Sequence, residues 1–314
     1  MRALEIEKYN LITITGATAS GKTAIAANLA LKINGEIISA DSRQVYKNMD
    51  IGTGKDIHDY TIDGVNVPYH LINIVEAGTK YNVYEYKKDF SIVYNNIISR
   101  NKTPILCGGT GLYIEAVLKN YNMIYVPTND KLRTSLKDKT IDELENILTS
   151  YKPLHNKSDL DTRKRAIRAI EIEDFYKKNY VSYIKDFDIN PIIIGIYFER
   201  EERRKRITER LIYRLENGLI EEVENLIQLG ISNEDIEYYG LEYKFVSWYL
   251  SGKINYDELF TQLNSAIHQF SKRQMTWFRK MERNGTKIKW IDGILPMNKK
   301  IETILIAIAS KSDI

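Results

Sequence analysis

The residues GATASGKT, at positions 16–23, match the pattern G-x-x-x-x-G-K-[S/T] of a phosphate-binding loop. In such a loop, successive backbone N–H groups and the N-terminus of the following helix direct positive potential towards phosphate oxygens. Lys22 adds a positive charge, and the hydroxyl of Thr23 is placed to bind Mg²⁺. We therefore expect a phosphorylated ligand and a Mg²⁺ cofactor at the eight loop residues, which are Gly16, Ala17, Thr18, Ala19, Ser20, Gly21, Lys22 and Thr23.

A candidate catalytic carboxylate follows a different strand from the one that carries the metal-binding carboxylate in most nucleotide-hydrolysing enzymes. Those enzymes need an acid at the end of an apolar strand to hold the metal, but the strand predicted over 103–107 is followed by Gly108, Gly109 and Thr110. Asp41 instead ends the predicted strand EIISA, at the edge where ligands bind in open α/β sheets. From its position alone, Asp41 could also be a helix cap or a turn residue.

The pattern of apolar residues predicts an α/β fold, a P-loop NTPase-like parallel sheet flanked by helices. Strands are expected at 10–15, 36–40, 103–107, 191–198 and 286–291, and helices at 82–101, 203–230, 244–252 and 256–281, among others. Between 120 and 190 only helical patterns occur, which indicates a helical insertion domain within a core formed by 1–119 and 191–314. After Pro296 we expect only a polar tail.

Composition is that of a soluble globular protein, with 43% apolar and 28% charged residues among 314. The N-terminus has no apolar leader and no long uncharged apolar run follows, so we expect a cytoplasmic protein with no membrane association. The single cysteine, Cys107, excludes an internal disulfide and is expected to pack in the core. Basic clusters at 163–168, 203–206 and 271–280 suggest a polyanionic partner, although a solvated helix face explains any one of them alone.

Six segments, in order and spacing, resemble the bacterial tRNA dimethylallyltransferases. They are GATASGKT (16–23), DSRQVYKNMDIGTGK (41–55), HLINI (70–74), PILCGGTGLY (104–113), RAIRAIE (165–171) and FSKRQMTWFR (270–279). The resemblance implies Mg²⁺-dependent transfer of a dimethylallyl group from dimethylallyl diphosphate to N6 of adenosine 37, in the anticodon stem-loop of tRNAs that read codons beginning with U. The products would be N6-(dimethylallyl)adenosine and pyrophosphate. Ala17 stands where most relatives have proline.

The resemblance also assigns roles to individual residues. Asp41 would accept the proton of the adenine amino group, Thr110 would line the reaction channel, and Arg206 would bind pyrophosphate, with Arg203, Arg204 and Arg210 as open alternatives to Arg206. The residues implied to contact tRNA are Asp41, Ser42, Arg43, Gln44, Thr110, Arg133, Lys164, Arg165, Ala166, Ile167, Arg168, Lys272, Arg273 and Trp277.

Three other functions use the same loop and sheet: a small-molecule or nucleotide kinase, an RNA-binding ATPase, and an adenylate isopentenyltransferase that acts on free nucleotide. The sequence favours transfer to tRNA, because Asp41, GGTG (108–111) and the basic helices occur together and no kinase lid is evident. No obligate protein partner is evident either, so we expect a monomer.

Overall fold

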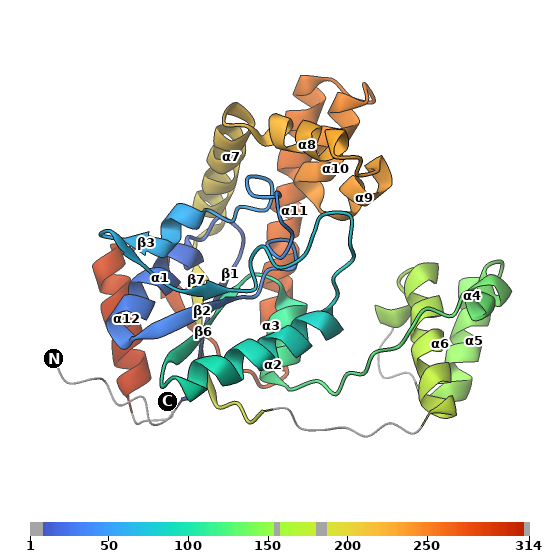
Figure 1. Ribbon diagram of the computed structural model, residues 1–314, viewed down its shortest axis with the longest axis horizontal. Helices are drawn as coiled ribbons and strands as arrows, with labels where there is room; N and C mark the ends of the chain where they lie inside the picture. The colour runs from blue at the N-terminus through green and yellow to red at the C-terminus, as the bar shows by residue number, and fades with distance from the viewer. Residues whose placement is uncertain (1–8, 154–157, 180–186, 311–314) are drawn as a thin grey trace. The chain divides into compact units, whose positions relative to one another are not determined.

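The computed structural model describes residues 9–153, 158–179 and 187–310, and these fall into two compact units. The first unit comprises 1–121 and 186–314, and the second comprises 122–185, which lies inside the predicted insertion. The predicted P-loop-like α/β fold is confirmed in the first unit (Figure 1). No helix in the described ranges is long and apolar enough to cross a membrane.

A six-stranded parallel sheet forms the centre of the first unit, with strand order β5-β2-β6-β1-β7-β8. The chain runs from β1 to strands on one side of it and later returns to its other side with β7. At such a switch point, the carboxyl ends of the strands form the crevice in which open α/β sheets bind ligands. The strands are β1 (Leu11–Gly16), β2 (Gly35–Ser39), β5 (Tyr69–His70), β6 (Thr103–Gly108), β7 (Pro191–Tyr197) and β8 (Lys289–Asp292).

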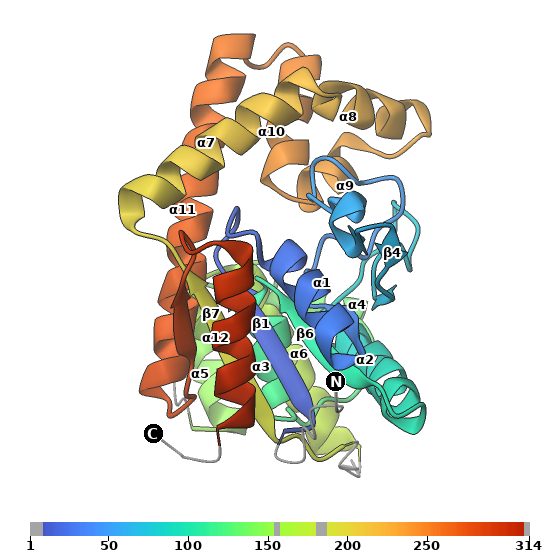
Figure 2. The same cartoon turned by 90° about the vertical axis from the view of Figure 1, so that its left-hand side faces the viewer.

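Each face of the sheet is covered by helices and has its own hydrophobic core. One core packs Ile12, Ile14 and their strand neighbours against α1 (Lys22–Ile33) and α12 (Met297–Ala309). The other packs Leu11, Ile38 and Leu106 against α2 (Val83–Ser99), α3 (Gly111–Leu118) and the long α11 (Tyr256–Arg283). Figure 2 shows α1 and α12 on one side of the strands. Both faces being covered explains why these strands read as nearly continuous apolar runs.

The remaining elements of the first unit lie around the crevice. They are α7 (Arg200–Glu216), α8 (Leu219–Gln228), α9 (Asn233–Tyr238), α10 (Leu241–Leu250), a 3₁₀ turn (Ile57–Tyr60) and the two-stranded β3 (Thr61–Ile62) and β4 (Val65–Asn66). The second unit contains α4 (Asp130–Leu136), α5 (Ile141–Tyr151), a 3₁₀ turn (Ser158–Leu160) and α6 (Arg163–Lys178).

Two expectations about the helices were wrong. The residues after Pro296 are not a polar tail, because Ile301, Ile304 and Ile308 recur at helical spacing and bury one face of α12 in the core beside α1. The helix expected over 203–230 is two helices, α7 and α8, because Gly218 has a φ of 100° and this left-handed conformation interrupts the helix. Capping boxes begin two of the helices, Asn82 with Glu85 at α2 and Thr140 with Glu143 at α5.

Candidate active site

The phosphate-binding loop connects β1 to α1 and forms one wall of a cavity of about 390 Å³. Residues from Thr18 to Thr23 line this cavity. Gly16 has to be glycine, because a Cβ there would lie 2.9 Å from the carbonyl oxygen of Ile196 on the neighbouring strand. The Lys22 ammonium donates to the carbonyl oxygen of Ala17 at 3.3 Å, and burial lowers the pKa of Lys22. The negative charge of a bound phosphate would stabilise the protonated form of Lys22 and so oppose this effect of burial.

The candidate base lies on the opposite wall. The strand β2 ends at Ser39, and the chain then follows β6 through hydrogen bonds from Ala40 N–H to Cys107 and from Thr110 N–H to Ala40. This path carries Asp41 to the cavity, where its Oδ1 accepts from the backbone N–H of Arg43 at 2.9 Å. The other oxygen of the carboxylate has no hydrogen-bond partner within the described ranges, so it can accept a proton or a ligand N–H.

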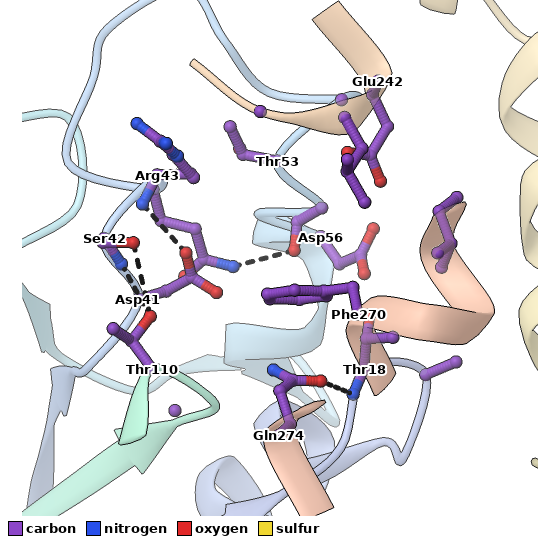
Figure 3. Close-up of a pocket in the computed structure, with 18 of the residues that line it drawn as sticks. Thr18, Asp41, Ser42, Arg43, Thr53, Asp56, Thr110, Glu242, Phe270 and Gln274 are labelled. Atoms are coloured by element: carbon purple, nitrogen blue, oxygen red, sulfur yellow. Dashed lines mark hydrogen bonds between the residues drawn. The ribbon is translucent and has the colours of Figure 1, made fainter. Parts of the chain in front are cut away.

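The same close approach explains why β6 ends without an acid. A Cβ on Gly108 would lie 2.2 Å from the carbonyl oxygen of Ala40, so no side chain fits at this strand end. Thr110 takes the adjoining place in the cavity wall, and its hydroxyl oxygen accepts from the backbone N–H of Ser42 at 3.1 Å (Figure 3). Cys107 is buried as predicted and borders the cavity, and burial raises the pKa of its thiol to about 12.

Gln274 of α11 joins the two walls of the cavity. It lies in the segment FSKRQMTWFR (270–279), but the sequence alone predicts no role for it. Its Oε1 accepts from the backbone N–H of Thr18 at 2.8 Å, and its Nε2 donates to the carbonyl oxygen of Gly109 at 3.0 Å (Figure 3). The side chain is 8% exposed. One buried amide therefore fixes the distance between the phosphate-binding loop and the loop that carries Thr110.

The arginines of α7 meet the phosphate-binding loop in two different ways. Arg210 lines the cavity and donates to the Thr18 hydroxyl, and burial, reinforced by the nearby Arg214, lowers the pKa of Arg210 to about 9. Arg206 does not border the cavity. It donates from Nε to the carbonyl oxygen of Ala19 at 3.1 Å and lies over the ring of Phe198. The expected role of Arg206 in binding pyrophosphate stays a prediction, and Arg210 is the better placed alternative.

Aromatic and apolar side chains cover the space between the phosphate-binding loop and Asp41. Phe270 of α11 points into the cavity between Thr18 and Asp41 in Figure 3, and Ile267 lies one turn before it. On the far side, Tyr238 borders the cavity and the guanidinium of Arg43 lies 5.0 Å from the centre of its ring. Phe270 is 39% exposed, and the sequence offered no signal that separates it from the other surface positions of α11.

The segment after Asp41 is held by two charged groups, the buried Lys55 and the partly exposed Glu222. The ammonium of Lys55 is fully buried and donates to the carbonyl oxygen of Tyr46, to Asp50 and to Asn73. The carboxylate of Glu222 on α8 accepts from the backbone N–H groups of residues 50–52 and from the hydroxyl of Tyr243. These contacts hold residues 50–55 in place, and Gly52, Thr53 and Gly54 of this segment line the cavity.

The other predicted tRNA contacts of the first unit divide into three groups. Ser42, Arg43 and Arg273 line the cavity with Asp41 and Thr110. Gln44 also borders it, but both ends of its amide are engaged, by Ser39 at 3.0 Å and by the carbonyl oxygen of Gly54 at 2.9 Å. Lys272 faces a different cavity, and the ring of Trp277 packs against Gly111 of α3. Trp277 therefore supports the start of α3 rather than facing the cavity.

Within the second unit, two of the predicted arginines hold one buried carboxylate. Arg133 donates from two nitrogens to Glu171, at 3.0 and 2.9 Å, and Arg168 donates both to Glu171 and to the carbonyl oxygen of Val126. The arginines hold the pKa of Glu171 below its usual value against the opposing effect of burial. Ala166 is fully buried in this unit's core and offers no side chain to RNA, whereas Lys164 and Arg165 are exposed and Ile167 is partly exposed.

The loop fits the chemistry of Mg²⁺ bound mainly through its ligand. In the described part of the chain, no cluster of three or more histidine, cysteine, aspartate or glutamate side chains could form a metal cage. Thr23 opens the first turn of α1 and lines the cavity. Mg²⁺ in proteins commonly keeps several waters and is held through one or two carboxylates together with substrate phosphates, so the Thr23 hydroxyl and a bound diphosphate would supply part of its ligands.

Fold and site together define a P-loop α/β protein in which the phosphate-binding loop and a carboxylate line one cavity. The family model for IPP transferase matches residues 44–281. Over 96% of this chain, the sequence is 56% identical to tRNA dimethylallyltransferase 1 of Parabacteroides distasonis, of which it covers 98%. It is 54% identical to tRNA dimethylallyltransferase 2 of Phocaeicola vulgatus, over 98% of this chain and 100% of that protein. The chain therefore belongs to the IPP transferase family.

Solved structures agree with this assignment. The tRNA isopentenylpyrophosphate transferase of Bacillus halodurans superposes with a TM-score of 0.71 at 32% identity, over 96% of both chains. A eukaryotic dimethylallyltransferase crystallised while acting on tRNA has a TM-score of 0.77 at 22% identity, over 95% of this chain and 77% of that one, and so shows a shared fold.

Proposed function

We propose that this enzyme transfers a dimethylallyl group from dimethylallyl diphosphate to N6 of adenosine 37 in tRNAs that read codons beginning with U. The single observation that carries the mechanism is the common cavity of the phosphate-binding loop and Asp41. The family assignment supports transfer to tRNA, and neither the kinase nor the free-nucleotide alternative finds support among the relatives. We expect it to act as a cytoplasmic monomer.

In the proposed reaction, the bond between C1 of the donor and the diphosphate oxygen breaks while a bond forms between C1 and N6 of adenine. The leaving group takes the bonding electrons, and the loop amides, Lys22 and Arg210 stabilise its growing charge. Mg²⁺ held by Thr23, when bound, would supply further positive charge to the diphosphate. The apolar side chains of Ile267 and Phe270 are suited to hold the five-carbon group out of water.

The proton of the adenine amino group passes to Asp41 in this proposal. The Arg43 backbone N–H fixes one carboxylate oxygen and leaves the other free to face the amino group. Adenosine 37 has to leave the stack of the anticodon loop to reach the cavity, which costs a few kcal/mol that contacts in the pocket recover. We assign those contacts to Ser42, Arg43 and Thr110, and backbone contacts to Lys164, Arg165 and Arg273.

The test is transfer of labelled dimethylallyl groups from the diphosphate to unmodified tRNA or to free AMP. We expect label on tRNA that carries adenosines at positions 36 to 38 of the loop. Replacement Asp41→Asn keeps the acceptor for the Arg43 N–H but removes the base, and should lower kcat by about 10²- to 10⁴-fold with tRNA affinity retained. Label on AMP alone, or full activity of Asp41→Asn, would refute the proposal.

A further inference from the structure

A second, strongly basic cavity lies between the start of α7 and α11, with a volume of about 650 Å³. Five cationic side chains border it, and none of its described lining residues is an aspartate or glutamate. The cations come from two helices: Arg200, Arg203 and Arg204 from α7, and Lys272 and Arg279 from α11. The helices lie against each other in Figure 2.

This cavity is distinct from the one that holds Asp41. Along α11, residues 267, 270 and 274 face the first cavity, and residues 268, 272 and 279 face the second. With about 100° of rotation per residue, these two sets lie on different faces of the same helix. On α7, the first-cavity residues Arg210 and Arg214 come at least six positions after Arg204.

The charges of the second cavity are poorly compensated by the protein itself. Among the described residues, Arg203, Arg204, Lys272 and Arg279 form no ion pair, and Arg200 forms only an exposed one with Glu201 at 3.9 Å. Arg200 and Arg203 also stand in the first turn of α7, where the helix dipole favours negative charge, and Glu199, Glu201 and Glu202 at this helix start offset their charge only in part. Burial and the like charges of Arg279 and Arg200 lower the pKa of Arg203. A bound anion would compensate the unpaired positive charges and reduce the repulsion between the arginines.

Two residues that border the cavity, His268 and Ser271, also have buried polar atoms without a hydrogen-bond partner among the described residues. His268 contacts the Thr208 hydroxyl through Nε2 at 3.3 Å, while its buried Nδ1 has no hydrogen-bond partner in the described part of the chain. The same is true of the buried hydroxyl of Ser271, which is 1% exposed. Both atoms are shielded from solvent and do not themselves face the cavity, so the cations that border it carry the argument for a bound anion.

We propose that this second basic cavity binds a small phosphate-bearing anion of the pyrophosphate class. Arginine suits this ligand because its fork can bind two phosphate oxygens at once. The five cations border one hollow of about 650 Å³, which is in the size range of small-ligand sites and favours a small anion over the backbone of an RNA. The inference does not depend on the proposed transfer reaction.

The experiment is calorimetric titration of inorganic pyrophosphate into Lys22→Met protein, in which the phosphate-binding loop is impaired. We expect saturable binding with one site per chain. Adding Arg203→Gln and Arg279→Gln should raise the dissociation constant at least tenfold. The matched control adds Lys280→Gln and Arg283→Gln, which remove the same charge from α11 outside the cavity and should change the constant less than twofold. Thermal melting checks that each variant is folded.

Three results would overturn the proposal. They are no saturable binding to the Lys22→Met protein, equal weakening by the control pair, and an effect of Arg203→Gln with Arg279→Gln on binding of an anticodon stem-loop RNA but not of pyrophosphate. The last result would assign the cavity to the RNA backbone.

Discussion

The bridge made by Gln274 predicts a defect confined to the donor side of the reaction. Replacement Gln274→Leu keeps the approximate shape of the side chain but leaves the Thr18 N–H and the Gly109 carbonyl oxygen without their partner. A net hydrogen bond contributes about 1 kcal/mol, so losing two should cost about 2 kcal/mol. If this energy positions the phosphate-binding loop for the transition state, kcat/KM for the diphosphate donor should fall about 30-fold.

The assay is steady-state transfer with the donor varied at saturating tRNA, together with a separate measurement of tRNA affinity. We expect tRNA affinity to change less than twofold. The variant Gln274→Glu retains an acceptor for Thr18 but opposes a carboxylate to the Gly109 carbonyl. Its activity relative to the unchanged enzyme should therefore rise at lower pH, where the protonated carboxyl can donate. Unchanged donor kinetics in Gln274→Leu, or an equal loss of tRNA affinity, would refute the positioning role.

Three further predictions concern other charged groups. Arg210→Gln should raise the KM for the donor at least tenfold and more than Arg206→Gln does, because only Arg210 borders the cavity, and donor kinetics of the two variants decide this. The affinity for tRNA should fall steeply between about 50 and 200 mM salt, measured by filter binding, because lysine and arginine contacts to phosphates displace counterions. Hydrogen bonds from Arg100 and His70 hold the pKa of the buried Glu36 at about 2, below its ordinary value of 4.5. These contacts therefore stabilise the fold above pH 4.5 and lose that contribution as the pH falls towards 2. Glu36→Gln should lower the free energy of unfolding more at pH 7 than at pH 3, and equal effects at both pH values would contradict this account.

Local signals in the sequence were sufficient for the elements that carry the phosphate-binding loop. The strand, loop and helix around 16–23 and the capping boxes at Asn82 and Thr140 depend on residues within one turn of each other, so their patterns are readable directly. The apolar face of α12 has the same kind of signal, in Ile301, Ile304 and Ile308, but the polar residues around them make this segment resemble a surface tail.

The partners across the cavity were decided by tertiary structure alone. Gln274 contacts Thr18 and Gly109, which precede it in the sequence by 256 and 165 positions. Nothing in the sequence around Gln274 distinguishes an amide that joins two loops from an amide on a solvated helix face. Likewise, Arg206 and Arg210 are one turn apart on α7, and only the path of the phosphate-binding loop determines which guanidinium borders the cavity. The sequence by itself predicted that the phosphate-binding loop and a carboxylate lie at one edge of the sheet, because both follow parallel strands. The packing of α7 and α11 on that edge determined which side chains face the ligand, because it depends on contacts between segments far apart in the chain.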